Sequence, residues 1–110
     1  MGDDRMALPQ GTLDLLILRT LQLEARHGVA IADRIAQMTG GTFQVKPGSL
    51  FPALHRLEQD GWIQGTWGES AEGRRVRTYM LTAAGKKKLA AEKANWQRVA
   101  AAVSHVLDWA

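Results

Sequence analysis

The chain has 110 residues, of which 45% are hydrophobic and 23% charged, and its formal net charge is +3. This length and composition predict one domain with one hydrophobic core, and they exclude an intrinsically disordered chain. The sequence contains no cysteine, which excludes disulfide bonds, thiolate metal sites and cysteine nucleophiles.

The sequence does not have the features of a membrane or secreted protein. Its most apolar stretch, residues 13–23, contains Asp14 and Arg19 and is far shorter than a membrane crossing requires. Asp3 and Asp4 make the N-terminus acidic, whereas a signal peptide begins with basic residues. We therefore expect a cytoplasmic protein without a membrane segment.

Helical spacing of apolar residues predicts two helices in the first third of the chain. The first is expected to begin at Thr12, whose side chain can cap free backbone N–H groups, and its apolar positions include Leu13 and Ile17. A turn is expected at residues 27–28. The second helix is expected over residues 29–38 and should end at the glycine pair that follows.

The middle of the chain predicts a short strand and a third helix. Apolar and polar residues alternate over residues 43–46, which indicates a strand. The third helix is expected to begin at Ser49 or just after it, because Pro52 is tolerated only in the first turn of a helix. This helix should end at Asp60 and Gly61.

A hairpin and a long helix are expected next. Residues 62–67 and 76–81 are typical of strands, and the polar loop between them is bracketed by glycines. Trp62 and Trp67 are expected to brace this hairpin against the core. Thr82 is expected to cap a helix that runs through the alanine-rich remainder of the chain.

Apolar residues of this last helix recur every seven positions, which indicates a seam between two helices. No earlier helix is long enough to cover the seam, so we expect a second copy of the chain to cover it. The predicted dimer interface consists of Leu89, Trp96, Val99, Val103, Val106 and Leu107.

The order of elements predicts a mostly α fold with a small β-hairpin: a winged helix-turn-helix plus a long C-terminal dimerisation helix. Residues 1–81 are expected to form the DNA-binding domain and residues 82–110 the dimerisation helix. In this fold the third helix enters the major groove of double-stranded DNA, and the hairpin touches the backbone or the minor groove.

Candidate DNA contacts lie at the front of the third helix and on the hairpin. Free N–H groups at a helix start suit a phosphate, and arginines suit phosphate or the minor groove. An ordinary solvated surface is the alternative interpretation. The predicted contacts are Lys46, Ser49, Phe51, Pro52, His55, Arg56, Arg74, Arg75 and Arg77.

Several motifs resemble the PadR family of transcriptional regulators. The run PGSLFPALHRLE at residues 47–58 is similar to the family's recognition-helix signature, and GTLDLLIL at residues 11–18 resembles its start. The resemblance implies a homodimer that binds a palindromic operator and represses transcription. The family usually has tyrosine where Phe51 stands, so a phosphate contact from that hydroxyl is missing here.

Trp96 has two interpretations. At its position in the seven-residue repeat it packs in the dimer seam. By resemblance, it stacks a flat aromatic inducer between the paired helices, and the ligand favours a helix spacing that misfits DNA. The residues that would line such a ligand pocket are Leu13, Ile17, Trp96, Val99 and Val103.

The sequence carries no catalytic or metal-binding motif. His27, His55 and His105 are far apart and have no carboxylate at a familiar offset. We expect no catalytic residue, metal or cofactor. Two alternative functions stay open: a winged helix that binds only proteins, and a small-molecule sensor whose pocket is the main functional site.

Overall fold

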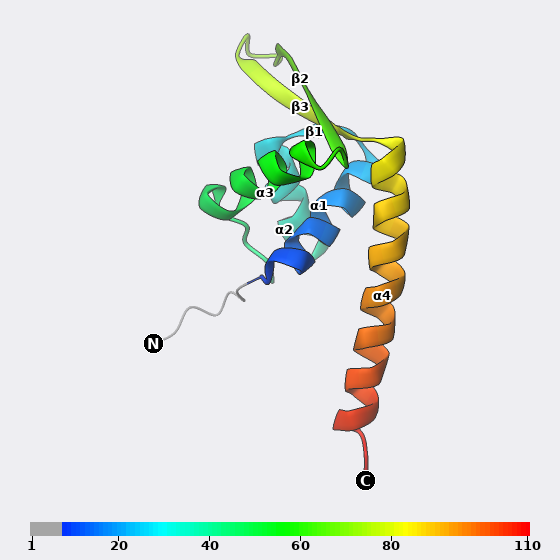
Figure 1. Ribbon diagram of the computed structural model, residues 1–110. Coiled ribbons are helices and arrows are strands. Elements are labelled where there is room, and N and C mark those ends of the chain that lie inside the picture. Colours follow the sequence, from blue (N-terminus) through cyan, green and yellow to red (C-terminus); the bar gives the residue numbers. More distant parts are fainter. Residues whose placement is uncertain (1–7) are drawn as a thin grey trace.

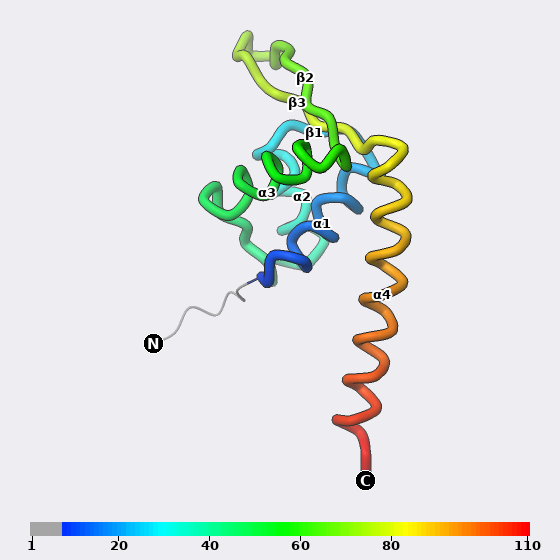
Figure 2. The backbone as a smooth tube through the Cα atoms, in the orientation of Figure 1, coloured from blue at the N-terminus to red at the C-terminus, as the bar shows by residue number. Residues whose placement is uncertain are grey.

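The computed structural model describes residues 8–110. Three short helices form a bundle, a β-hairpin projects from one end of it, and a long helix runs along α1 and continues past the bundle (Figure 1). The tube in Figure 2 shows the same extension of the last helix away from the rest of the chain. The elements are α1 (Gln10–Leu23), β1 (Arg26–His27), α2 (Gly28–Met38), α3 (Pro47–Gln59), β2 (Ile63–Glu69), β3 (Arg75–Leu81) and α4 (Ala83–Leu107).

One apolar core lies between the three short helices, the base of the hairpin and the start of α4. Each of these helices turns its apolar stripe inward, as amphipathic helices do in small domains. Four helices and a small antiparallel sheet therefore make the mostly α fold that the sequence predicts. The buried apolar residues are Leu13, Ile17, Leu18, Leu21, Ile31, Ile35, Leu50, Ala53, Leu54, Leu57, Ile63, Tyr79 and Leu89.

The sheet has three strands rather than the two that were predicted. The order is β1-β3-β2, and both pairings are antiparallel. Arg26 pairs with Tyr79 and His27 with Thr78, so the expected turn at residues 27–28 is wrong. A two-residue strand has no alternation to detect, and only the position of β3 makes these residues extended. We call the hairpin of β2 and β3 the wing.

The predicted strand at residues 43–46 is also wrong. This segment has no regular secondary structure, although Phe43 and Val45 pack against the core. The alternation is real, but the described structure provides no neighbouring strand for these residues to pair with. Strand formation needs such a partner, because a single extended segment leaves its backbone groups unpaired.

Two helix starts differ from the predictions. α1 begins at Gln10 without a side-chain cap, so the expected cap by Thr12 is wrong. α3 begins at Pro47 rather than Ser49, and proline suits this first position because its fixed φ is already helical. Pro52 consequently lies beyond the first turn of α3.

The cap of the last helix is as predicted. Thr82 accepts a hydrogen bond from the Gly85 backbone N–H at 2.9 Å and donates one to the carbonyl oxygen of Gly61 at 2.7 Å. Burial along α4 ends at Leu89. The start of α4 is therefore part of the core, and no later residue of this helix is buried by the described chain.

Candidate nucleic-acid interface

The front of α3 is an exposed polar patch. Lys46 is the N-cap residue of this helix, and Ser49, Pro52 and His55 follow at three-residue spacing on one side of it. All four side chains are exposed, and the first turn holds no acidic residue. The positive end of the helix dipole and the lysine charge make this patch suitable for an anionic partner. We call these four residues the α3 patch.

Phe51 has a packing role beside its predicted role in DNA contact. Its side chain is 44% exposed, and one edge of its ring lies against Gly28 at the start of α2. A Cβ atom at Gly28 would lie only 2.8 Å from Cε1 of this ring. Phe51 therefore joins α3 to α2, which accounts for a large aromatic side chain at a half-exposed position.

Arg56 is not a free outward side chain. Its Nη2 atom forms an ion pair with Oδ1 of Asp14 on α1, and the side chain is 32% exposed. This carboxylate occupies part of the guanidinium and partly neutralises its charge. The sequence places Arg56 on α3 correctly, but it does not reveal Asp14, which lies 42 residues earlier in the chain.

The three wing arginines differ in their surroundings. Arg74 lies at the exposed tip, where its backbone N–H donates to the Ser70 hydroxyl at 3.1 Å. Arg75 is exposed and lies over the ring of Trp67, 4.4 Å from its centroid. Arg77 is 29% exposed and forms an ion pair with Glu58 on α3. Of the three, Arg74 and Arg75 are the more available to a DNA phosphate.

Trp67 is a surface platform rather than a core brace. Its side chain is 57% exposed, and the guanidiniums of Arg75 and Arg77 lie 4.4 and 5.3 Å from its ring centroid. Stacking on an aromatic face holds an arginine in place without neutralising its charge. Trp62, by contrast, packs against the core as the sequence predicts.

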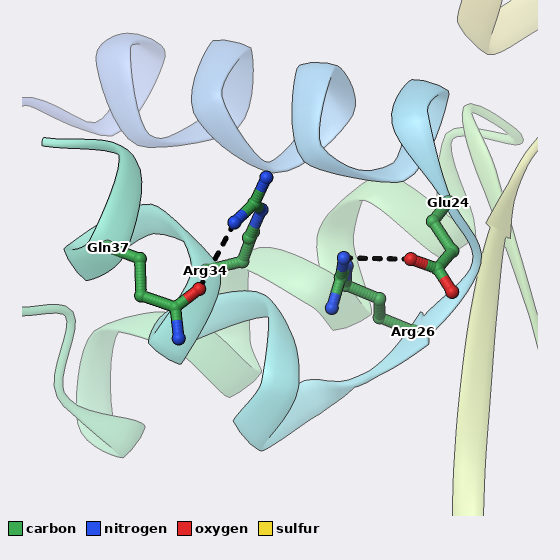
Figure 3. A network of polar contacts seen from close by, with 4 residues as sticks. All are labelled: Glu24, Arg26, Arg34 and Gln37. Atoms are coloured by element: carbon green, nitrogen blue, oxygen red, sulfur yellow. Dashed lines mark hydrogen bonds and ion pairs between the residues drawn. The ribbon is translucent and has the colours of Figure 1, made fainter.

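Two further arginines are used within the fold. Arg26 pairs with Glu24 at 2.9 Å, and Arg34 donates to the side-chain oxygen of Gln37 at 3.2 Å (Figure 3). The Nε atoms of both arginines are buried. Both side chains are thus held by partners near α2 and do not add to the α3 patch.

The second half of α4 carries an apolar stripe that the described chain leaves uncovered. Its side chains are between 50% and 76% exposed, whereas Leu89, the sixth predicted interface residue, is 2% exposed and lies in the core. Leu89 consequently belongs to the packing of a single chain. The residues that we call the α4 stripe are Trp96, Val99, Val103, Val106 and Leu107.

A shallow hollow of about 220 Å³ separates the start of α1 from Trp96 and Val99. Leu15 lines it, but three predicted pocket residues do not. Leu13 and Ile17 are 5% and 0% exposed, because they lie on the side of α1 that faces the core. Val103 lies on the α4 stripe but does not line the hollow.

Within residues 8–110, no group of three or more histidine, aspartate or glutamate side chains is arranged to hold a metal ion. The same range includes no helix long and apolar enough to cross a membrane.

The bundle and the wing together form a winged helix-turn-helix, the fold that the sequence predicts. The model of the transcriptional regulator PadR-like family matches residues 17–91, and the chain belongs to this family. It is thus a regulator of transcription and not an enzyme.

Relatives and solved structures agree with this assignment. An uncharacterised protein of Lysinibacillus sphaericus is 30% identical over 95 residues, which cover 86% of this chain and 87% of that protein. A PadR-like transcriptional regulator from Bacillus cereus has a TM-score of 0.79 at 29% identity, covering 92% of this chain and 96% of that one. A transcriptional regulator from Clostridium thermocellum has a TM-score of 0.79 at 26% identity, covering 86% and 92%.

Proposed function

We propose that the chain binds a specific double-stranded DNA sequence as a homodimer and represses transcription. The observation that carries this proposal is the α3 patch, which lies on a helix whose opposite face is held in the core. An α-helix fits the major groove, and polar side chains at its front can reach base edges. Arg74 and Arg75 on the wing would add phosphate contacts that position the helix.

The α4 stripe supports the homodimer. Monomeric soluble proteins rarely expose a contiguous apolar patch of this kind, and its seven-residue spacing suits pairing with an identical helix. A two-fold axis between two α4 helices would present two α3 helices to successive major grooves. The half-sites of a palindromic operator would then lie roughly 34–36 Å apart. Residues 1–81 would contact DNA, and residues 82–110 would join the chains.

The hollow beside Trp96 supports a small-molecule effector as a further part of the proposal. A planar aromatic ligand can stack on an exposed indole, and ligand between the α4 helices would release DNA by favouring a different helix spacing. Pure packing of Trp96 is the competing interpretation. Quenching of tryptophan fluorescence by planar dyes, lost in a dimeric Trp96→Ala variant, would support the ligand site, and no quenching would remove it.

Selection of bound DNA from a random pool tests the main proposal. We expect enrichment of a palindrome that the protein shifts in a gel, with affinity that falls as salt rises. If no sequence is enriched and no salt-sensitive shift occurs at micromolar protein, the proposal fails and a winged helix that binds only proteins is favoured.

A reporter gene behind the selected operator tests repression. We expect the protein to lower expression in a bacterial cytoplasm, the compartment in which we propose that it acts. An increase in expression would make the chain an activator instead.

A further inference from the structure

One carboxylate connects α3 to both strands of the wing. Glu58 lies in the last turn of α3, and its Oε2 atom accepts a hydrogen bond from the Gly65 backbone N–H on β2 at 3.1 Å. The same oxygen accepts a hydrogen bond from Nη2 of Arg77 on β3. We call these three residues the brace.

Gly65 makes the brace sterically feasible. The Arg77 side chain crosses β2 directly over this glycine, and a Cβ atom there would lie 2.5 Å from the Arg77 Nε atom. The crossing guanidinium also lies 5.9 Å from the ring centroid of Tyr79, which is anchored in the core. A residue with a side chain at position 65 would push Arg77 away from Glu58.

The position of the brace determines what it can control. A two-stranded hairpin is marginally stable alone, so its orientation depends on contacts with the rest of the domain. The pairing of Ile63 with Leu81 forms the base of the wing, and the brace holds the wing beyond this base. Arg74 precedes Arg77 by three residues, just before β3, and lies roughly 10 Å closer to the tip of the wing. A small change of angle at the brace therefore moves the tip by a larger distance.

We propose that Glu58 is a positioning residue for DNA binding, which acts by fixing the angle between α3 and the wing. Arg77, which the sequence suggests as a DNA contact, serves this brace. The inference rests on the proposed DNA-binding function. Because the angle is fixed before binding, α3 and the wing tip can contact one duplex at the same time. Ordering of Arg74 and Arg75 then does not lower the affinity for DNA.

The Glu58→Ala variant, which removes the acceptor of both hydrogen bonds, separates this role from simple electrostatics. Removal of a negative charge close to DNA should by itself strengthen binding. The brace predicts the opposite: roughly tenfold weaker operator binding, since the tip arginines must then be ordered on binding.

Two other variants complete the design. Glu72→Gln removes an exposed acidic charge at the wing tip and leaves the brace intact, so it should bind DNA at least as tightly as the wild type. Gly65→Ala keeps every charge but displaces Arg77, and it should reproduce the loss seen in Glu58→Ala. If Glu58→Ala behaves like Glu72→Gln, the proposal is overturned.

A measurement without DNA keeps this inference separate from the proposed function. Residual dipolar couplings of backbone amides report the orientation of β2 and β3 relative to α3. Glu58→Ala should change these couplings and speed hydrogen exchange at the Gly65 amide. Unchanged couplings in a folded variant overturn the brace even if DNA binds, whereas wild-type protein that binds no operator overturns only the proposed function.

Discussion

α3 and the second half of α4 are both amphipathic helices, but the fold leaves opposite faces of them exposed. In α3 the apolar side, including Leu50 and Leu54, is buried and the polar side faces outward. In α4 the apolar side, including Trp96 and Val103, is half-exposed. The face that remains uncovered indicates the partner: a polar, basic surface suits a polyanion, and an apolar stripe suits another apolar surface.

A charge introduced into the α4 stripe should have the largest effect. We expect Val103→Asp to weaken dimerisation by about 100-fold or more. In the proposed dimer, the change removes one valine from each chain's side of the interface, worth about 1.5 kcal/mol each, and it desolvates two carboxylates. Sedimentation equilibrium measures the change. Ala101→Asp is the matched control, since position 101 faces away from the stripe and should leave dimerisation unchanged. If both variants dimerise equally well, the α4 stripe is not the dimer interface.

The junction between the wing and α4 should be the next most sensitive feature. A Cβ atom at Gly85 would lie 2.0 Å from the backbone oxygen of Trp62 and 2.8 Å from Leu81. We expect Gly85→Ala to lower the free energy of unfolding by about 1–3 kcal/mol, measured by urea denaturation. Gly11→Ala is the control, because open space surrounds that position. It should be neutral or stabilising by about 0.5–1 kcal/mol.

Arg74→Ala tests the polar side of the comparison. Loss of one phosphate contact should reduce the slope of log affinity against log salt by about 0.9 and weaken binding to all sequences equally. Titrations of operator and random DNA over a range of salt measure this. Lys93→Ala on α4 removes the same charge away from the α3 patch and should keep the wild-type slope. Equal slopes for Arg74→Ala and the wild type would count against a phosphate contact.

The Arg56–Asp14 pair should show the smallest effect. Asp14→Asn releases the guanidinium, and we expect operator binding up to about fivefold tighter, the scale of ~1 kcal/mol for a partly exposed ion pair. If Arg56 reads a base, Arg56→Ala should weaken specific binding by about 1–3 kcal/mol. Adding Asp14→Asn to Arg56→Ala should then leave the affinity for the operator unchanged. Fluorescence anisotropy measures this affinity. If Asp14→Asn still tightens operator binding in the Arg56→Ala background, the effect belongs to Asp14 alone.

Local patterns predicted most of the fold. The apolar spacing gave three short helices and one long one, glycines marked the hairpin loop, and Thr82 was correctly predicted as the cap of α4. These signals involve residues within about one turn or one hairpin of each other, so they can be detected in a linear sequence. The exposed members of the candidate interface, including His55 and Arg74, were selected in the same way.

The bonds of the candidate site depended on tertiary structure. Arg56 and Arg77 looked equivalent to the other basic residues, but packing places each beside a carboxylate, 42 and 19 residues away in the chain. β1 exists only because β3 lies beside it, and Gly85 is required only because a backbone oxygen approaches it.

The sequence by itself determined where the four helices and the hairpin form, since those choices depend on neighbours along the chain. The tertiary structure alone decided which charges remain available and which apolar face remains uncovered. Both depend on segments distant in sequence that packing brings within a few ångströms, at distances where ion pairs and steric contacts act.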